Sequence, residues 1–167
     1  MKGDKDMSID ITKACSFTGH RPERLRFPES KVIPWLEAEI KKAVDEGYTT
    51  FISGMQRGVD LWAAEIILKL RDEGVNIKLV AAAAFRGMES QWDHSWRKRY
   101  KKVLREADET VYVSGIPGRA AFFKRNRYMV DRSSLVIAVY SGGGGGTKET
   151  IRYAEEKGIE VRKYVSE

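Results

Sequence analysis

The stretch that decides the fold is Leu135–Thr147, which reads LVIAVYSGGGGGT. It begins with an apolar run, continues as a glycine-rich loop, and is followed by an amphipathic segment from Lys148. This order predicts a strand, a tight loop and a helix. Glycine has no Cβ, so the loop backbone can adopt positive φ and approach a bound molecule closely. The helix start offers unpaired N–H groups and a partial positive charge, which together favour a phosphate.

Short β-rich runs alternate with longer helical segments along the whole chain. The predicted strands are Ile11–Phe17, Thr49–Ser53, Ile77–Ala84, Thr110–Val113, Leu135–Tyr140 and Glu160–Tyr164. Strands separated by helices form βαβ units with right-handed crossovers, so neighbouring strands are parallel. We therefore expect an α/β protein with a single doubly wound, Rossmann-like domain, a mostly parallel sheet and helices on both faces. Residues 1–10 are expected to form a polar N-terminal tail, and residues 11–167 the domain.

The spacing of apolar residues predicts the helices between these strands. The first helix carries an i, i+3, i+4 stripe from Val32 to Val44, ends at Gly47 and should hold Pro34 in its first turn. The segment Val59–Leu70 is apolar almost all round, which is typical of a helix buried on several sides. Aromatic side chains on the later helical segments are expected to pack in the core rather than stack on bases. They are Trp92, Trp96, Tyr100, Phe122 and Phe123.

Composition excludes several classes of protein. No apolar run approaches the ~20 residues that cross a bilayer, and the first ten residues lack an apolar signal segment, so we expect a cytoplasmic protein that does not contact membranes. Cys15 is the sole cysteine of the sequence, so no intramolecular disulfide forms, and a buried inert thiol is expected. His20 and His94 do not suggest a metal site, and His20 is expected to be a hydrogen-bond donor rather than a catalytic base.

The charge balance favours an anionic ligand. Thirty Lys and Arg against 24 Asp and Glu leave a net charge of +6. The excess gathers in two segments, 97–105 and 119–132. The first is expected to be a solvated helix face, whereas the second, which leads into the glycine-loop strand, is expected to be part of a site.

Polar and glycine-rich motifs follow several predicted strands. Because the carboxyl ends of parallel strands meet at one edge, where ligands of such sheets bind, these motifs should converge. The candidate ligand-binding residues are Thr18, Gly19, His20, Arg21, Ser53, Gly54, Met55, Gly58, Asp60, Arg125, Asn126, Arg127, Asp131, Gly144, Gly145, Gly146 and Thr147.

Some of these residues admit two interpretations. Asp60, near a helix start, either caps that helix or binds a ribose hydroxyl. Arg125 or Arg127 can present a fork of donors to a phosphate, and Asn126 can read a base edge or a hydroxyl. The alternative is that Asp131 pairs with a neighbouring arginine and the remaining charges meet water.

Four ordered motifs resemble the YpsA-like family of the SLOG superfamily, over about Ile11 to Val165. They are Thr18–Pro22, Ser53–Glu65, Arg125–Ser133 and Gly145–Thr147. The resemblance implies a Rossmann-like fold with a pocket for a nucleotide or nucleotide derivative, in a family of mostly uncharacterised bacterial proteins. The superfamily includes the Lonely Guy phosphoribohydrolases and the DNA-processing protein DprA, which binds single-stranded DNA. Its members commonly assemble with themselves, so a homo-oligomer is expected.

The chain departs from the hydrolytic relatives at one position. Lonely Guy proteins read Pro-Gly-Gly-x-Gly-Thr-x-x-Glu, and here Thr150 stands in place of that glutamate. Glu149 lies one residue earlier, about 100° away around a helix. A hydroxyl substitutes poorly for a carboxylate in glycosidic cleavage. Arg127 and Glu149 remain the candidate catalytic residues, and whether the protein is an enzyme stays open.

These observations favour a nucleotide-binding protein, with AMP, ADP-ribose or an NAD-like molecule as its small-molecule ligand, acting as a sensor. No cofactor and no metal is expected to be required. One alternative is a phosphoribohydrolase-like N-glycosidase. A second is a DprA-like module that binds single-stranded DNA, which the segment Ser53–Asp60, the pI of about 9.4 and the basic segment 97–105 support. A third is a protein that docks a partner and uses the pocket as a regulatory input.

Overall fold

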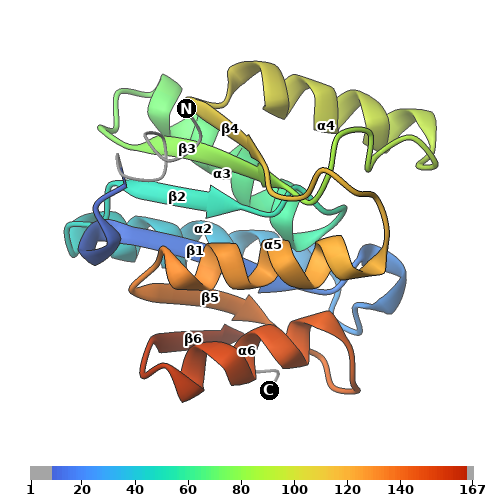
Figure 1. The fold of residues 1–167 in the computed structure, drawn as a ribbon. Coiled ribbons are helices and arrows are strands. Elements are labelled where there is room, and N and C mark those ends of the chain that lie inside the picture. Colours follow the sequence, from blue (N-terminus) through green and yellow to red (C-terminus); the bar gives the residue numbers. More distant parts are fainter. Residues whose placement is uncertain (1–8, 165–167) are drawn as a thin grey trace.

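The computed structural model describes residues 9–164, and these form a six-stranded, all-parallel sheet with helices on both faces (Figure 1). The strand order is β4-β3-β2-β1-β5-β6. The strands are β1 (Ala14–Gly19), β2 (Thr50–Ser53), β3 (Lys78–Ala83), β4 (Glu109–Tyr112), β5 (Leu135–Val139) and β6 (Glu160–Tyr164). The α/β, Rossmann-like fold expected from the sequence is confirmed.

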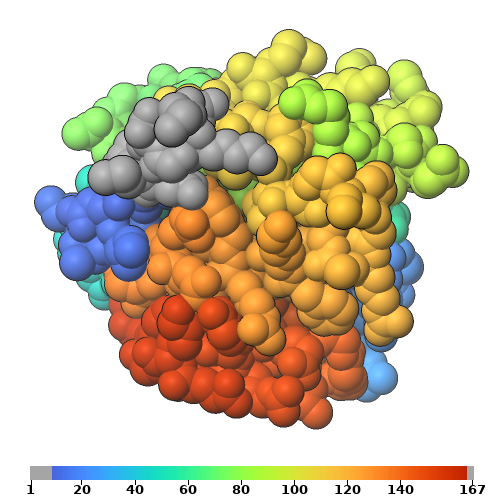
Figure 2. Space-filling model, viewed as in Figure 1, coloured from blue at the N-terminus to red at the C-terminus, as the bar shows by residue number. Residues whose placement is uncertain are grey.

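Helices divide between the two faces according to the direction in which the chain travels. The chain runs outward from β1 to β4, then crosses back over the sheet and places β5 on the other side of β1. Since right-handed crossovers in opposite directions lie on opposite faces, one face carries the first three helices and the other the last two. These are α2 (Glu29–Asp45), α3 (Val59–Asp72) and α4 (His94–Glu106), then α5 (Arg119–Asp131) and α6 (Gly146–Glu156). Figure 2 views the second face, where α5 and α6 pack side by side.

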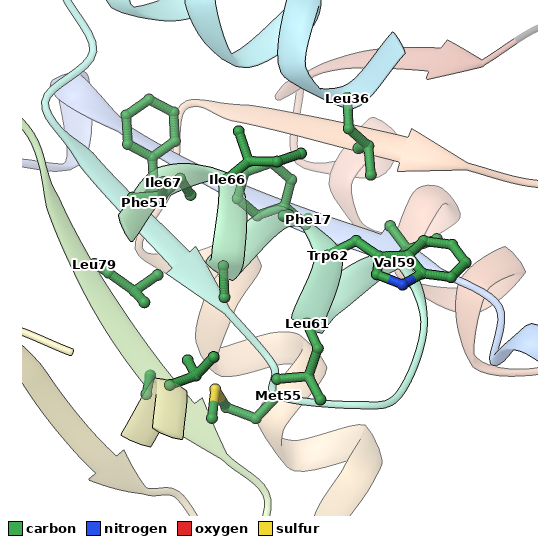
Figure 3. Packing of buried hydrophobic residues seen from close by; sticks show 14 of the residues in the cluster. Phe17, Leu36, Phe51, Met55, Val59, Leu61, Trp62, Ile66, Ile67 and Leu79 are labelled. Carbon is green, nitrogen blue, oxygen red and sulfur yellow. The ribbon is translucent and has the colours of Figure 1, made fainter. Parts of the chain in front are cut away.

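The sheet is buried on both faces, which explains why its strands are apolar at almost every position. In β2, Phe51 belongs to the core beneath α3 whereas Ile52 belongs to the core beneath α5. In β5, Ile137 belongs to the core beneath α3, whereas Val136 belongs to a core on the opposite face. Figure 3 shows the larger core, in which side chains of α3 lie against those of the strands.

The predicted starts of the first strand and the first long helix are wrong. The first strand begins at Ala14, because Asp10 folds residues 11–13 into the 3₁₀ turn η1 (Ile11–Lys13) by accepting the Thr12 N–H at 3.1 Å and its hydroxyl at 2.6 Å. Helix α2 begins at Glu29, so Pro34 lies inside it rather than in its first turn.

The first described residue already packs against the sheet. Ile9 is buried in the core beneath α5. Residues 1–8 of the expected tail lie outside the described residues.

The cysteine expectation is confirmed, and so is core packing of Trp92, Trp96, Tyr100 and Phe122. The expectation is wrong for Phe123, which is 38% exposed because its side chain lies on the cavity side of α5. Tyr100 is fully buried, and the Trp92 ring packs edge-on against it at 5.5 Å. Trp96 lies 6.4 Å from Trp62 in the same core. Cys15 is a buried free thiol whose pKa is raised by desolvation. Among the helices of residues 9–164, none is sufficiently long and apolar to span a bilayer.

Close backbone packing fixes the loop after β1 against the start of α3. A Cβ added to Gly19 would lie 2.5 Å from Cγ2 of Val59, and a Cβ on Gly58, whose φ is 91°, would lie 2.9 Å from the carbonyl oxygen of His20. Glycine is therefore required at both positions, and the loop cannot move away from α3 without opening the core.

We predict that Gly19→Ala lowers the free energy of unfolding by about 1–3 kcal/mol, because the added methyl overlaps Val59 and one of the two must shift. Gly115→Ala is the matched control, since nothing lies within 4 Å of its added Cβ and its φ is not positive. Urea denaturation of both variants measures the difference. Equal stability of the two variants would contradict this description of the packing.

Candidate functional site

A cavity of about 580 Å³ lies at the carboxyl ends of the strands, where the strand order reverses beside β1. Its walls come from the loop after β1, the start of α3, helix α5 and the glycine loop. The sequence-predicted residues that line it are Thr18, Gly19, His20, Arg21, Asp60, Arg125, Asn126, Gly144, Gly145, Gly146 and Thr147. The structure thus brings together residues from four separate motifs.

The glycine loop and α6 form the wall suited to an anion. Gly142, Gly143 and Gly145 have φ values of 100°, 84° and 115°, which other residues rarely adopt. Helix α6 begins at Gly146, and no side chain of the described residues caps its first turn. Its N–H groups are therefore available at the cavity, next to the buried Thr147.

Side-chain hydrogen bonds hold this glycine loop in place. The Tyr140 hydroxyl donates to the carbonyl of Gly143. The Ser141 hydroxyl accepts the Arg26 N–H at 3.3 Å and donates to the Arg24 carbonyl at 3.4 Å. These bonds connect the loop after β5 to the loop after β1 across the point where the strand order reverses.

Arg125 places a fixed positive charge in the cavity wall although the residue is only 6% exposed. Its Nη1 donates to the Gly54 carbonyl at 2.6 Å and its Nε donates to Oδ1 of Asn126 at 3.0 Å. The guanidinium also lies 5.4 Å from the centre of the Phe122 ring. Burial lowers the pKa of Arg125, yet an arginine remains protonated in proteins.

Asp60 places a carboxylate in the same wall, from the first turn of α3, and it is also only 6% exposed. Its Oδ2 accepts the Gln56 N–H at 3.3 Å, whereas Oδ1 has no hydrogen-bond partner among residues 9–164. Burial raises the pKa of this carboxyl to about 6, and Arg125 and the Gln56 N–H offset part of that rise. Gly58, not Asp60, is the N-cap residue of α3. The Asp60 carboxylate therefore accepts an N–H of the preceding loop and does not accept one from the first turn of the helix.

The predicted residues Ser53, Gly54, Met55 and Gly58 shape this wall without lining the cavity. The Ser53 hydroxyl donates to the Asp60 carbonyl at 2.8 Å and accepts the Met55 N–H at 3.1 Å. A Cβ on Gly54 would lie 2.9 Å from both the Arg125 Cδ and the Asp60 Oδ2. Glycine at this position lets the two opposite charges approach the same short stretch of backbone.

His20 completes the wall formed by the loop after β1. The residue is 8% exposed, and its ring stacks on Tyr140 at a centroid distance of 5.5 Å. Burial and the neighbouring Arg24 and Arg26 lower the pKa of His20, so the imidazole is neutral at neutral pH. No partner for its Nε2 occurs in the described part of the chain.

The predicted ligands Arg127 and Asp131 lie elsewhere. Arg127 is two positions from Arg125, about 200° around the helix, and its guanidinium stacks on Tyr153 at 4.8 Å. Asp131 accepts a hydrogen bond from the Tyr153 hydroxyl at 2.7 Å and from the ammonium of Lys157, the residue that follows α6, at 2.5 Å. Both residues line a neighbouring cleft of about 890 Å³ between α5 and the β4 edge.

The hydrolytic carboxylate of the Lonely Guy pattern has no counterpart in α6. The Thr150 hydroxyl donates to the Gly146 carbonyl at 2.7 Å inside its own helix. Glu149 pairs with Arg152 at 3.0 Å on the surface and does not line the 580 Å³ cavity. Among the described lining residues, Asp60 is the single carboxylate.

Sequence reasoning missed part of the lining. Phe122 lies three residues before Arg125 and therefore on the same face of α5, a spacing that could have placed its ring in the site. Core packing explained that aromatic residue equally well, and its ring does pack on Phe85 at 5.6 Å. The other cavity residues that were not named as candidate ligands are Phe17, Arg24, Gln56, Gly118, Arg119 and Phe123. Over residues 9–164, no cluster of His, Cys, Asp and Glu suited to a metal ion is found.

Comparison with solved structures places the fold. DNA processing protein A (DprA) from Streptococcus pneumoniae superposes with a TM-score of 0.67 at 16% identity, covering 93% of this chain and 51% of that one. The DprA of Helicobacter pylori, described for its single-stranded DNA binding mode, gives a TM-score of 0.68 at 15% identity, covering 98% of this chain and 69% of that one. At these identities the likeness shows the shared fold.

Comparison of sequences places the family. The YpsA family model, described as the YspA SLOG family, matches residues 15–165, and the chain belongs to this family. The UPF0398 protein BH1768 of Halalkalibacterium halodurans is 34% identical over 106 residues, which are 62% of this chain and 56% of that relative. The matched stretch thus spans little more than half the length of BH1768. The resemblance seen in the four motifs is confirmed.

We predict that Asp60→Asn stabilises the unliganded protein at neutral pH. The folded pKa of about 6 lies above the ordinary aspartate value of 3.8, so the contribution of this carboxyl to stability is fully present below pH ~4 and is lost as the pH rises through about 6. Asparagine carries no charge, and it should raise the free energy of unfolding by about 2–3 kcal/mol at pH ~8, with no gain at pH ~4. Denaturant titrations across this pH range measure the effect.

Asp72→Asn, a matched change at the exposed end of α3, should leave the pH dependence of stability as it is in the native protein. Loss of stability in Asp60→Asn at pH ~8 would show that the buried carboxylate stabilises the fold, contrary to this prediction.

Proposed function

We propose that this protein binds a nucleotide or nucleotide derivative such as AMP, ADP-ribose or an NAD-like molecule in the 580 Å³ cavity. The observation that carries the proposal is the meeting of Arg125, buried and charged, with the uncapped start of α6 in one cavity at the point where the strand order reverses. Parallel α/β sheets bind ligands at such points, and helix N-termini favour phosphate there.

The remainder of the cavity suits the other parts of a nucleotide. Arg21, Arg24 and Arg119 also line it, so four arginines face one carboxylate and the cavity favours an anion. Phe122 and Phe123 supply an aromatic wall beside Arg125, against which a planar base can stack. A volume of about 580 Å³ lies within the range of small-molecule sites.

Binding rather than hydrolysis is the function proposed. Thr150 bonds within α6 and Glu149 is paired on the surface, so the residues present do not reproduce the carboxylate of the phosphoribohydrolases. Phosphate contacts from backbone N–H groups and Arg125 do not depend on that carboxylate. A protein that holds a nucleotide and cleaves none of its bonds fits the role of a sensor.

Two arginines of α5 provide a matched test of the site. We predict that Arg125→Gln weakens nucleotide binding at least tenfold, because a charge-assisted hydrogen bond to phosphate contributes about 1.5–3 kcal/mol. Arg127→Gln removes the same charge from the same helix outside this cavity and should bind as the native protein does. Calorimetric titration with AMP, ADP-ribose and NAD measures both variants, and product analysis for free base shows whether any bond is cleaved.

The outcomes separate the interpretations. Absence of binding by all three compounds refutes the proposal. Binding that is weakened by Arg127→Gln and unaffected by Arg125→Gln would move the site to the 890 Å³ cleft. Release of free base would establish a hydrolase.

Binding of single-stranded DNA is the second candidate function, and α4 is the observation that favours it. Lys98, Lys101 and Arg105 are exposed on one face of that helix, and for residues 9–164 no ion pair with them is found. The fold shared with DprA supports the same candidate.

We predict for this candidate that affinity for a labelled single-stranded oligonucleotide, measured by fluorescence anisotropy, falls steeply with salt. Changing Lys98 and Lys101 together to Gln should reduce both the affinity and the salt dependence. Binding that stays weak at low salt, or that is unchanged in the double variant, would remove α4 as a nucleic-acid surface.

A further inference from the structure

The 890 Å³ cleft is separate from the 580 Å³ cavity, and α5 lies between them. This helix supplies Phe122 and Arg125 to the cavity, whereas it supplies Lys124 and Tyr128 to the cleft. The other side of the cleft is residues 110–115, which include most of β4, a strand that pairs with β3 alone. Neither of the functions considered above uses this cleft.

Much of the cleft wall is apolar or aromatic, and all of it is at least partly exposed. The apolar and aromatic lining residues are Phe85, Val111, Tyr112, Val113, Pro117 and Tyr128. A molecule with an apolar body would remove this surface from water on binding, which favours its entry. The volume lies within the range of small-molecule sites.

Three cations surround this apolar surface without acidic partners. They are Arg86, Lys124 and Arg127, which are exposed and line the cleft, and in the part of the chain that the structure describes no ion pair with them is found. Asp131 is the single carboxylate among the described lining residues, and it already accepts a hydrogen bond from Lys157. The cleft therefore has an excess of positive charge that a bound anion can neutralise.

Aromatic rings hold two of these cations in place. The guanidinium of Arg86 lies 4.1 Å from the centre of the Tyr112 ring, and that of Arg127 lies 4.8 Å from the centre of the Tyr153 ring. A ring attracts a guanidinium through its face and leaves the N–H groups at the guanidinium edge available. Both arginines are thus positioned to donate to an anionic group, and neither spends its charge on a carboxylate of the protein.

We propose that the 890 Å³ cleft is a second ligand site, for a small molecule that joins an apolar or aromatic body to an anionic group such as a carboxylate, sulfonate or phosphate. The apolar wall between α5 and β4 would hold the body, and the three cations would hold the anionic group. The inference does not depend on nucleotide binding in the 580 Å³ cavity.

Two fluorescent dyes that differ in one charged group test this site. Anilinonaphthalenesulfonate (ANS) is an aromatic anion, and phenylnaphthylamine has the same rings without the sulfonate. The native protein should bind one equivalent of ANS, at least about tenfold more tightly than phenylnaphthylamine, because charge-assisted hydrogen bonds are added to the same apolar contact. Fluorescence titration measures both affinities.

Variants of the cations locate the bound dye. Arg86→Gln and Lys124→Gln together should weaken ANS binding at least about tenfold and change phenylnaphthylamine binding less than about twofold. Lys148→Gln is the control, since it removes a charge from an exposed residue of the neighbouring α6 that lines neither the cleft nor the cavity. It should bind both dyes as the native protein does.

ANS binding that does not saturate at one equivalent per chain overturns the inference, as does equal affinity for the two dyes. ANS binding that is unchanged in the double variant also overturns it, since the dye then lies elsewhere. Loss of both dyes in that variant would show that the cations maintain the shape of the cleft and do not select an anion. ANS binding that strengthens as the protein is diluted would show that a second copy of the chain covers the cleft, which excludes the proposed site.

Discussion

The site depends on two opposite charges buried within reach of a single glycine. Arg125 comes from α5 on one face of the sheet and Asp60 from α3 on the other, and both approach the backbone at Gly54. They meet there because the chain reverses its direction across the sheet, which places helices of opposite faces at one edge. Each charge is desolvated, so its position depends on the surrounding loop. Hydrogen bonds of the Ser53 hydroxyl to the Asp60 carbonyl and the Met55 N–H fix that loop, and its glycines allow the close approach.

Such an arrangement lowers the stability of the fold. A carboxylate whose pKa is raised to about 6 disfavours the folded state at neutral pH, and its Oδ1, which has no hydrogen-bond partner among residues 9–164, adds to that penalty. The large cores on both faces of the sheet, with strands apolar at nearly every position, provide the stability that tolerates it. The buried charges therefore destabilise the site, whereas close packing fixes its backbone, as the tight approach of Gly19 to Val59 shows.

The sequence predicts the sheet and most of the cavity because each depends on local signals. Apolar runs predict the strands, and glycines predict the loops that line the cavity. What the sequence leaves undecided depends on angles around helices and on contacts between distant segments. Arg125 and Arg127 are two residues apart and equally basic, and only the packing of α5 places one in the cavity and the other on Tyr153. Asp10 likewise turns the start of the first expected strand into η1, which apolar spacing does not reveal.

The position of β5 beside β1 has a consequence for synthesis of the chain. The four strands β1 to β4 are complete before β5 leaves the ribosome, and until then β1 presents an unpaired edge. Pairing of β5 covers that edge and, in the same step, brings the glycine loop against the loop after β1 through Ser141. Pairing of β5 with β1 and completion of the cavity are thus one event, so a nascent chain lacks the complete cavity until β5 has joined the sheet.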